Sequence, residues 1–274
     1  MHSWYIRVEI DDLEDLMKTR VKTAIVALII FVPLLYLGSW YFKYTTSILG
    51  ILAMYEINKM TFKKTNNSVL LISVIAGAII YTNYPLPAIY FYSVFFLIGI
   101  AFLMTVVISG HKVKLTEIGV IIFLTAYVFV GFYSLFMLRE LGLSYVLYLL
   151  FTIWVTDSFA YIGGMRFGKN KISPNISPNK SIEGSVIGSL SSIVVALLFY
   201  FTTAIFTNIV MAVITTLVIS VIGQIGDLIE SAYKRECGVK DSSNLLPGHG
   251  GIFDRFDSVI LAAPCLALLL NLIA

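Results

Sequence analysis

The sequence predicts an all-α, polytopic integral membrane protein built as a single domain over residues 1–274. Three observations lead to this class. The chain is 58% hydrophobic and only 13% charged, whereas soluble domains carry about 25% charged residues. Its apolar residues form runs of membrane-spanning length. The charged residues gather between those runs, as expected for helices that cross a bilayer.

We predict about nine transmembrane helices, because successive apolar runs approach the ~20 residues that span the hydrocarbon core. The runs cover residues 23–41, 44–57, 68–83, 85–108, 116–138, 143–164, 184–203, 207–232 and 252–273. The second and third are short, and the weakest boundary is the segment Gly38–Tyr44. If residues 23–57 formed one span instead, the orientation of every later helix would invert.

The distribution of lysine and arginine predicts the orientation of these helices. With the N-terminus in the cytoplasm, all but two of the 19 basic residues lie on the cytoplasmic side, the exceptions being Lys43 and Arg139. This asymmetry follows the positive-inside rule. Residues 1–22 then form a cytoplasmic N-terminal segment, either a short amphipathic surface segment or a partly ordered tail, with no cleavable signal peptide. We expect a multi-pass protein of the cell membrane.

A dense polar island lies between the last two apolar runs, from Gln224 to Ser258. It holds six of the 16 acidic residues and four basic residues. Charged groups at membrane depth are expensive to place, so the island calls for a functional explanation. Its first half continues a helix on which Gln224, Asp227, Ser231 and Lys234 share one face, by their spacing of three and four residues.

The second half of the island is a turn followed by a new helix. The run Pro247–Gly251 cannot continue a helix, and its glycines allow positive φ and close backbone approach. Asp254, Arg255 and Asp257 follow in a first helical turn, where carboxylates are favoured by the helix dipole. We expect this loop to fold back and bring Asp227 and Asp254 together. Two carboxylates flanked by cations suit Mg²⁺ and a phosphate-bearing substrate; a solvated loop with paired charges is the alternative.

A second charged region lies further back in the chain. Asp157 is embedded in an apolar helix, toward its cytoplasmic end, either in a polar cavity or in a structural pair with a lysine or tyrosine. The basic loop 166–184 follows. Its charges either close on a substrate or merely fix the topology and contact anionic headgroups.

The polar island resembles the signature of the CDP-diacylglycerol synthases, the phosphatidate cytidylyltransferases. The matching residues are Ser231, Tyr233-Lys234-Arg235, Lys240-Asp241, Pro247-Gly248-His249-Gly250-Gly251-Ile252 and Asp254-Arg255-Phe256-Asp257. A second conserved region of that family is similar to Asp157, Ala160-Tyr161, Gly163, Arg166, Gly168-Lys169, Ser177-Pro178, Lys180 and Glu183-Gly184. The chain departs from it at Asn179, Ser181 and Ile182, where the family commonly has Lys, Thr and Trp. The resemblance covers roughly residues 15–274 and is strong only after 150, which puts the catalytic part at about 150–258.

The resemblance implies a Mg²⁺-dependent nucleotidyltransferase of phospholipid biosynthesis. It would transfer a cytidylyl group from CTP to phosphatidic acid, giving CDP-diacylglycerol and pyrophosphate. The acceptor is a phosphate monoester whose second pKa is about 6, so no strong general base is required. What is required is neutralisation and alignment of two polyanions, by metal ions and basic side chains.

On this basis we assign roles to the charged and glycine residues. The metal ligands would be Asp227 and Asp254, with a second cation left open. The catalytic set is Asp227, Asp241, Lys234, Arg235, Lys240, His249, Arg255 and Asp257. The substrate-binding set is Asp157, Arg166, Lys169, Ser177, Lys180, Ser231, Gly248, Gly250 and Gly251. These groups would form a polar cavity open to the cytoplasmic side.

Two other functions stay open at this point. One is a CTP-dependent lipid kinase acting on a polyprenol or similar alcohol, and the other is a transporter with buried acidic residues. The expected partners are CTP, phosphatidic acid and the lipid bilayer, with no nucleic acid, and a homodimer is left open. Glu56 and Glu117 are either substrate-side groups or ordinary helix-end carboxylates, and we favour the second interpretation. Gly184–Gly188 is interpreted as a helix-packing pattern.

Overall fold

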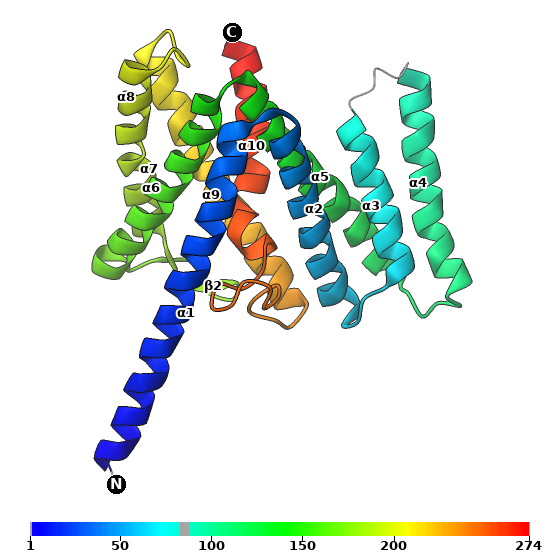
Figure 1. Ribbon diagram of the computed structural model, residues 1–274, viewed down its shortest axis with the longest axis horizontal. Helices are drawn as coiled ribbons and strands as arrows, with labels where there is room; N and C mark the ends of the chain where they lie inside the picture. The colour runs from blue at the N-terminus through cyan, green and yellow to red at the C-terminus, as the bar shows by residue number, and fades with distance from the viewer. Residues whose placement is uncertain (1, 83–87, 274) are drawn as a thin grey trace.

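The computed structural model describes residues 2–82 and 88–273, with side chains over residues 18–82 and 92–272. Its helices are α1 (His2–Leu37), α2 (Ser39–Phe62), α3 (Asn67–Thr82), α4 (Ala88–Ile108), α5 (Leu115–Leu141), α6 (Leu143–Phe167), α7 (Ile182–Ser191), α8 (Ile193–Thr202), α9 (Ile209–Glu236) and α10 (Phe253–Ile273). The predicted all-α class of membrane protein is confirmed (Figure 1). The predicted N-terminal segment is the start of α1, and its side chains before Lys18 lie outside the described residues.

Over the described residues, each predicted apolar run falls mainly on one helix, except that run 184–203 falls on two, α7 and α8, and the helices differ in length and apolarity. Among the described residues, six segments are long and apolar enough to cross a membrane: residues 18–37 of α1, α5, α6, α7 together with α8, α9, and residues 253–272 of α10. The helix α3 and residues 92–108 of α4 are apolar but shorter. The helix α2 carries Lys43, Glu56 and Lys59. The number of spans therefore stays a prediction.

The weak boundary predicted near Gly38 is a sharp reversal between two helices. Gly38 adopts a φ of 63°, which is in the left-handed region. Arg139 of α5 donates hydrogen bonds from Nε to the Leu35 carbonyl at 2.6 Å and from Nη2 to the Tyr36 carbonyl at 2.8 Å. These are carbonyls at the end of α1 that have no partner within the helix. Residues 23–57 therefore do not form one continuous helix, whereas whether α2 crosses the membrane as a second span stays a prediction.

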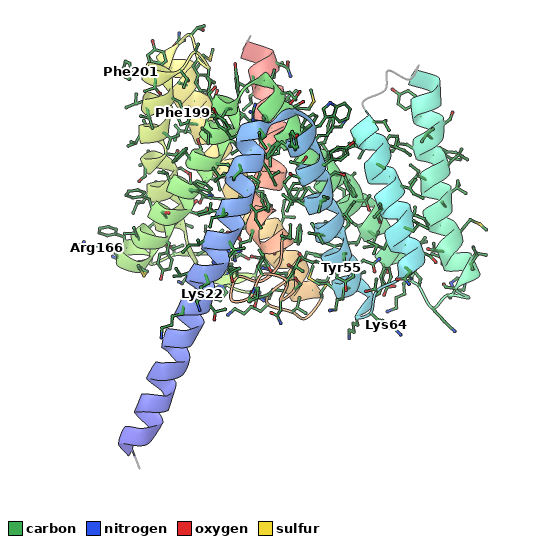
Figure 2. The ribbon with its side chains drawn as sticks, viewed as in Figure 1. Lys22, Tyr55, Lys64, Arg166, Phe199 and Phe201 are labelled. Carbon is green, nitrogen blue, oxygen red and sulfur yellow. The ribbon has the colours of Figure 1, made fainter. Side chains whose placement is uncertain are left out.

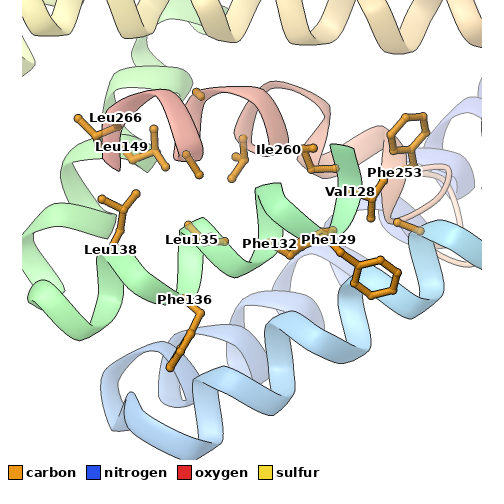
Figure 3. Close-up of a cluster of buried hydrophobic side chains, with 14 of the residues drawn as sticks. Val128, Phe129, Phe132, Leu135, Phe136, Leu138, Leu149, Phe253, Ile260 and Leu266 are labelled. Atoms are coloured by element: carbon orange, nitrogen blue, oxygen red, sulfur yellow. The ribbon is translucent and has the colours of Figure 1, made fainter. Parts of the chain in front are cut away.

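The core forms around α5, which packs between α2 and α10. In Figure 3, Phe132 and Leu135 of α5 lie beside Ile260 of α10, and all three side chains are buried. Gly131 lets the two helices approach, because a Cβ there would lie 2.5 Å from the Ile260 carbonyl oxygen. Tight helix contacts at small residues are typical of membrane bundles. This packing fixes α10, which carries part of the polar island.

The loops that contain charged residues share one end of the molecule. Residues 63–66, 109–114, 168–181 and 237–252 all lie there, as Figure 1 shows, and we call it the polar end. In Figure 2, Lys22, Lys64 and Arg166 lie toward this end, whereas Phe201 lies at the opposite one. The turns at Gly38 and at Gly142 also lie at the opposite end (Figure 1).

The basic loop 166–184 contains a β-hairpin that we did not predict. Strands β1 (Lys171–Ser173) and β2 (Ser177–Ser181) pair antiparallel. Ser181 then caps α7 by accepting a hydrogen bond from the Gly184 N–H at 3.2 Å. At the start of the hairpin, Glu183 accepts hydrogen bonds from the backbone N–H groups of Lys169 and Asn170 at 3.0 and 3.2 Å. The loop is therefore an ordered element with fixed ends.

Candidate active site

A cavity of about 1000 Å³ lies where α6, the hairpin, α7, α9 and α10 meet. Its lining combines charged and apolar side chains. The charged ones are Asp157, Lys171, Lys180, Asp227, Glu230, Lys234, Asp241, Asp254, Arg255 and Asp257. One wall is a face of α6, where Trp154, Tyr161 and Met165 are 49%, 69% and 66% exposed. Asp157 lies on the same face, between Trp154 and Tyr161, so this wall combines apolar and aromatic side chains with one carboxylate.

Three carboxylates from two helices converge in this cavity. One oxygen from each of Asp227, Glu230 and Asp257 lies within 4.8 Å of the others. Asp227 and Glu230 share a face of α9 because they are three residues apart. Gly226 lets α10 come close enough to add Asp257, since a Cβ at this glycine would lie 2.7 Å from the Asp257 carbonyl oxygen. Ser231 donates a hydrogen bond of 3.3 Å to Asp227 Oδ1.

Two lysines neutralise these acidic groups. Lys180, at the end of the hairpin, forms an ion pair with Asp227 Oδ2. Lys234 Nζ lies 2.8 Å from Glu230 Oε2 and 2.7 Å from Asp254 Oδ1. Buried carboxylates require such compensation, because an unpaired charge away from water is strongly unfavourable. The cavity therefore holds carboxylates and amines together, which suits a phosphate-bearing ligand with a metal ion.

The turn that the sequence predicts from its glycines wraps around Asp254. Asp254 Oδ2 accepts hydrogen bonds from the backbone N–H groups of Gly251 at 2.7 Å and Ser242 at 2.8 Å. Gly250 adopts a φ of 84°, and a Cβ there would lie 2.5 Å from Asp254 Oδ2. Only glycine allows the backbone this close. Gly248 instead packs on α1, where a Cβ would lie 2.8 Å from Arg20 Cγ.

The carboxylate cluster differs from the predicted pair of metal ligands. Asp227 and Asp254 line the same cavity, but the group that could hold an ion joins Asp227 to Glu230 and Asp257. Asp254 is engaged with Lys234 and with the turn. Glu230 Oε1 is buried and, among the described residues, has no hydrogen-bond partner. Three carboxylates with an open acceptor fit a hard divalent cation such as Mg²⁺.

The remaining predicted site residues divide into two groups. Asp157, Lys180, Asp241 and Arg255 line the cavity. Those outside its lining are Arg166, Lys169, Ser177, Ser231, Arg235, Lys240, Gly248, His249, Gly250 and Gly251. Arg235 donates to the carbonyls of Ile176 at 3.3 Å and Val239 at 2.9 Å, so it ties the hairpin to the end of α9. Their predicted roles toward CTP or lipid stay predictions.

Three residues that organise this site were not predicted from the sequence. Glu230 was counted among the acids of the polar island but given no role, although its spacing from Asp227 was a usable signal. Ser242 contacts Asp254 through its backbone and its hydroxyl, both at 2.8 Å. Glu56, interpreted as an ordinary helix-end carboxylate, is fully buried against the beginning of α10. No local pattern in the sequence indicates that last contact.

The fold and the cavity define a class: an all-α membrane protein whose polar site combines carboxylates and amines for a phosphate-bearing ligand. The profile of the cytidylyltransferase family matches residues 18–273. The chain belongs to this family.

Its relatives are similar along nearly their whole length. It is 38% identical over 265 residues to the phosphatidate cytidylyltransferase of Staphylococcus haemolyticus (strain JCSC1435). It is 38% identical over 257 residues to that of Staphylococcus aureus (strain COL), and 39% identical over 259 residues to that of Staphylococcus epidermidis (strain ATCC 12228 / FDA PCI 1200). Each match covers 93% of this chain and 99% of the relative.

Proposed function

We propose that this protein transfers the cytidylyl group of CTP to phosphatidic acid, giving CDP-diacylglycerol and pyrophosphate. The observation that carries the proposal is the convergence of Asp227, Glu230 and Asp257 with Lys180 and Lys234 in one cavity. With a divalent cation held by the carboxylates, the ion and the two lysines would offer positive charge to a triphosphate and a phosphate monoester at the same place. The names of the relatives and the family support the same reaction.

The exposed aromatic and apolar side chains that α6 adds to the cavity wall support a lipid acceptor. Trp154, Tyr161 and Met165 follow one another on the exposed side of α6 while also lining the cavity. An amphiphile could lie with its acyl chains along this wall and its headgroup against the charged side. Aromatic side chains are favoured where an apolar region meets a polar one. A soluble nucleotide alone would not require such a surface.

The reaction forms one bond and breaks another at the α-phosphorus of CTP. A phosphate oxygen of phosphatidic acid bonds to that phosphorus, and the bond from the phosphorus to the bridging oxygen of the β-phosphate breaks. Pyrophosphate leaves with the electron pair. Lys180, Lys234 and Arg255 would neutralise the phosphates and hold them in line. Because the acceptor is already ionised near neutral pH, none of these residues has to act as a strong base.

We further propose that the enzyme is Mg²⁺-dependent and that Asp227, Glu230 and Asp257 hold the ion. When bound, the ion would supply positive charge to the phosphate oxygens. Asp254 remains a proposed ligand, which would have to exchange Lys234 for the ion. Asp241, which also lines the cavity, could contribute through a water.

The proposed topology places this cavity at the cytoplasmic face of the cell membrane. With the N-terminus inside and about nine spans, the polar end lies in the cytoplasm, where CTP is available. Supporting this, loops 63–66, 109–114, 168–181 and 237–252 share one end of the molecule, as Figure 1 shows. Lys22, Lys64 and Arg166 lie toward that end (Figure 2). A homodimer stays open.

The decisive experiment follows the label of CTP. Purified protein in detergent micelles would receive phosphatidic acid, Mg²⁺ and CTP labelled at either the α- or the γ-phosphate. Cytidylyl transfer puts the α-label in the organic phase and the γ-label in pyrophosphate. A γ-label in lipid, obtained with a polyprenol acceptor, would establish the lipid kinase instead. Neither label in lipid, with ion flux in sealed vesicles, would establish the transporter.

A further inference from the structure

Glu56 of α2 is a fully buried carboxylate that contacts a loop almost 200 residues away in the sequence. Its side chain is 0% exposed. Oε1 accepts hydrogen bonds from the Ser243 hydroxyl at 2.6 Å and from the Ile252 N–H at 2.9 Å. Oε2 accepts one from the Phe253 N–H at 2.9 Å. Ser242 Oγ lies 3.0 Å from the same Oε2.

These contacts bind both ends of the loop 242–253 to one side chain. Ser242 and Ser243 stand at its beginning, whereas Ile252 and Phe253 stand where α10 begins. The first N–H groups of a helix have no partner within the helix and carry its positive dipole end. Glu56 therefore caps α10 from a different helix. The donors and the dipole together compensate a buried negative charge that forms no ion pair among the described residues.

The contacts continue from Glu56 toward the cavity. Ser242 Oγ lies within hydrogen-bonding distance of two carboxylates, Glu56 Oε2 at 3.0 Å and Asp254 Oδ2 at 2.8 Å. Its single proton serves one of them at a time. The backbone N–H of Ser242 also donates to Asp254 Oδ2 at 2.8 Å. Asp254 in turn holds Lys234, which reaches Glu230 of the carboxylate cluster.

Glu56 itself does not reach the substrate site. It is absent from the lining of the cavity, and a Cβ on Gly251 would lie 2.4 Å from both of its carboxylate oxygens. The loop is thus closed tightly over it. We propose that Glu56 is a positioning residue for cytidylyl transfer, which sets the loop 242–253 so that Asp254 and Lys234 stand beside the carboxylate cluster. This inference rests on the proposed function for its kinetic consequence, but not for its structural one.

The chemistry of the contact explains why a carboxylate is required. Glutamine has the same shape, but one of its two terminal atoms is a donor. Whichever way the amide turns, its NH₂ group would face a backbone N–H, of Ile252 or of Phe253. Two opposed donors in a buried place leave both unsatisfied, which is unfavourable. The variant Glu56→Gln therefore disrupts the loop without creating a cavity.

The experiment compares Glu56→Gln with a matched change in the same helix. Asn58 is also fully buried in α2, and its amide donates to the Asn66 carbonyl at 3.2 Å. The control Asn58→Ala thus perturbs α2 without touching the loop. The first readout is amide hydrogen exchange of the intact protein in detergent, over peptides spanning residues 242–256. We expect Glu56→Gln to lose protection there and Asn58→Ala to keep it.

The second readout separates positioning from simple loss of folded protein. We measure kcat with the α-label assay, per mole of folded protein. We expect Glu56→Gln to lower kcat about 10- to 100-fold, the range typical of residues that orient the site's side chains without contacting the substrate. Asn58→Ala should keep kcat within about twofold of the wild-type value, even if its unfolding temperature falls as much as that of Glu56→Gln. Equal kcat for Glu56→Gln and wild type would overturn the proposal, and so would unchanged hydrogen exchange in the loop.

A milder variant covers the case in which Glu56→Gln fails to fold. Ser243→Ala removes one donor to Glu56 Oε1 and leaves the backbone contacts in place. We expect the same two effects in smaller measure, a partial loss of protection and a kcat lowered a few-fold. Wild-type values in both readouts would overturn the proposal. If the wild-type protein moves no α-label into lipid, the proposed function fails, while hydrogen exchange still decides whether Glu56 holds the loop.

Discussion

Lys180 at the end of β2 forms an ion pair with Asp227 on α9 across the wall of the cavity. The pair links the hairpin, which the sequence indicates only as a basic loop, to Asp227 of the carboxylate cluster. It also places an amine for phosphate binding directly beside a carboxylate that could hold a metal ion. The hairpin is therefore part of the site.

Removing the charge of Lys180 should weaken CTP binding. The variant Lys180→Met leaves Asp227 without its partner and increases the repulsion between the carboxylates and the triphosphate. We expect KM for CTP to rise at least about tenfold, equivalent to ~1.4 kcal/mol. Steady-state kinetics measure this KM. We expect the KM of Lys180→Arg to lie between those of wild type and Lys180→Met. The control Lys64→Met, at an exposed position, should have the wild-type KM. An unchanged KM for Lys180→Met would show that the ion pair has no part in binding.

Asp227 and Asp254 should respond in opposite ways when each is changed to asparagine. Asp254 accepts two backbone hydrogen bonds and pairs with Lys234, so Asp254→Asn should lower the free energy of unfolding by about 1–3 kcal/mol. Asp227 lies within a cluster of like charges. Asp227→Asn gives up the partly exposed ion pair with Lys180 but relieves the repulsion from Glu230 and Asp257. We expect its unfolding temperature in detergent to equal or exceed that of wild type. A larger loss of stability for Asp227→Asn would contradict this assignment of roles.

The contact between α6 and α7 should not tolerate a larger residue at Gly184. A Cβ there would lie 2.5 Å from the Ala160 carbonyl oxygen and 2.9 Å from Gly164 Cα. Because these are backbone atoms, the helices have to separate, at a cost of about 1–3 kcal/mol. Thermal unfolding of Gly184→Ala measures the effect. The control is Gly119→Ala on α5, where a Cβ would meet nothing within 4 Å. Equal unfolding temperatures for the two variants would refute the close contact.

The proposed topology predicts which positions react from the cytoplasm. In a background without Cys237 and Cys265, Lys64→Cys at the polar end should react with an impermeant maleimide only in inverted vesicles. Thr207→Cys, in the turn before α9, should react only in whole cells. Both wild-type residues are exposed. The native thiols are removed first, although burial raises the pKa of the Cys237 thiol and slows its reaction. The reverse pattern would invert the orientation.

Much of this fold follows from local signals. The runs of apolar residues predict the helices, and the break at Gly38 lies in the segment that we predict as the weakest boundary. The polar face of α9 is predicted by the spacing of Asp227, Ser231 and Lys234, because residues three or four positions apart share a face of a helix. Hydropathy and periodicity are sufficient there, since neither depends on distant contacts.

The parts that the sequence did not predict depend on contacts between distant segments. From the sequence, Glu56 is interpreted as an ordinary acid near a helix end. Its hydrogen bond from the Phe253 N–H forms only when α2 and α10 pack together. Glu230 joins Asp227 and Asp257 in the carboxylate cluster, and this depends on how closely α10 approaches Gly226. Likewise, the pairing of Lys180 with Asp227 depends on the hairpin. None of these distances is encoded in a local pattern.

We propose that the cavity around Asp227 is the place where cytidylyl transfer occurs. The most direct measurement is the rate at which α-labelled CTP enters the lipid phase, for wild type, Asp227→Asn and Gly119→Ala, each per mole of folded protein. We predict transfer by wild type and by Gly119→Ala that stops when a chelator removes Mg²⁺, and no detectable transfer by Asp227→Asn. Transfer by Asp227→Asn at the wild-type rate would contradict the account, because the reaction would then take place elsewhere.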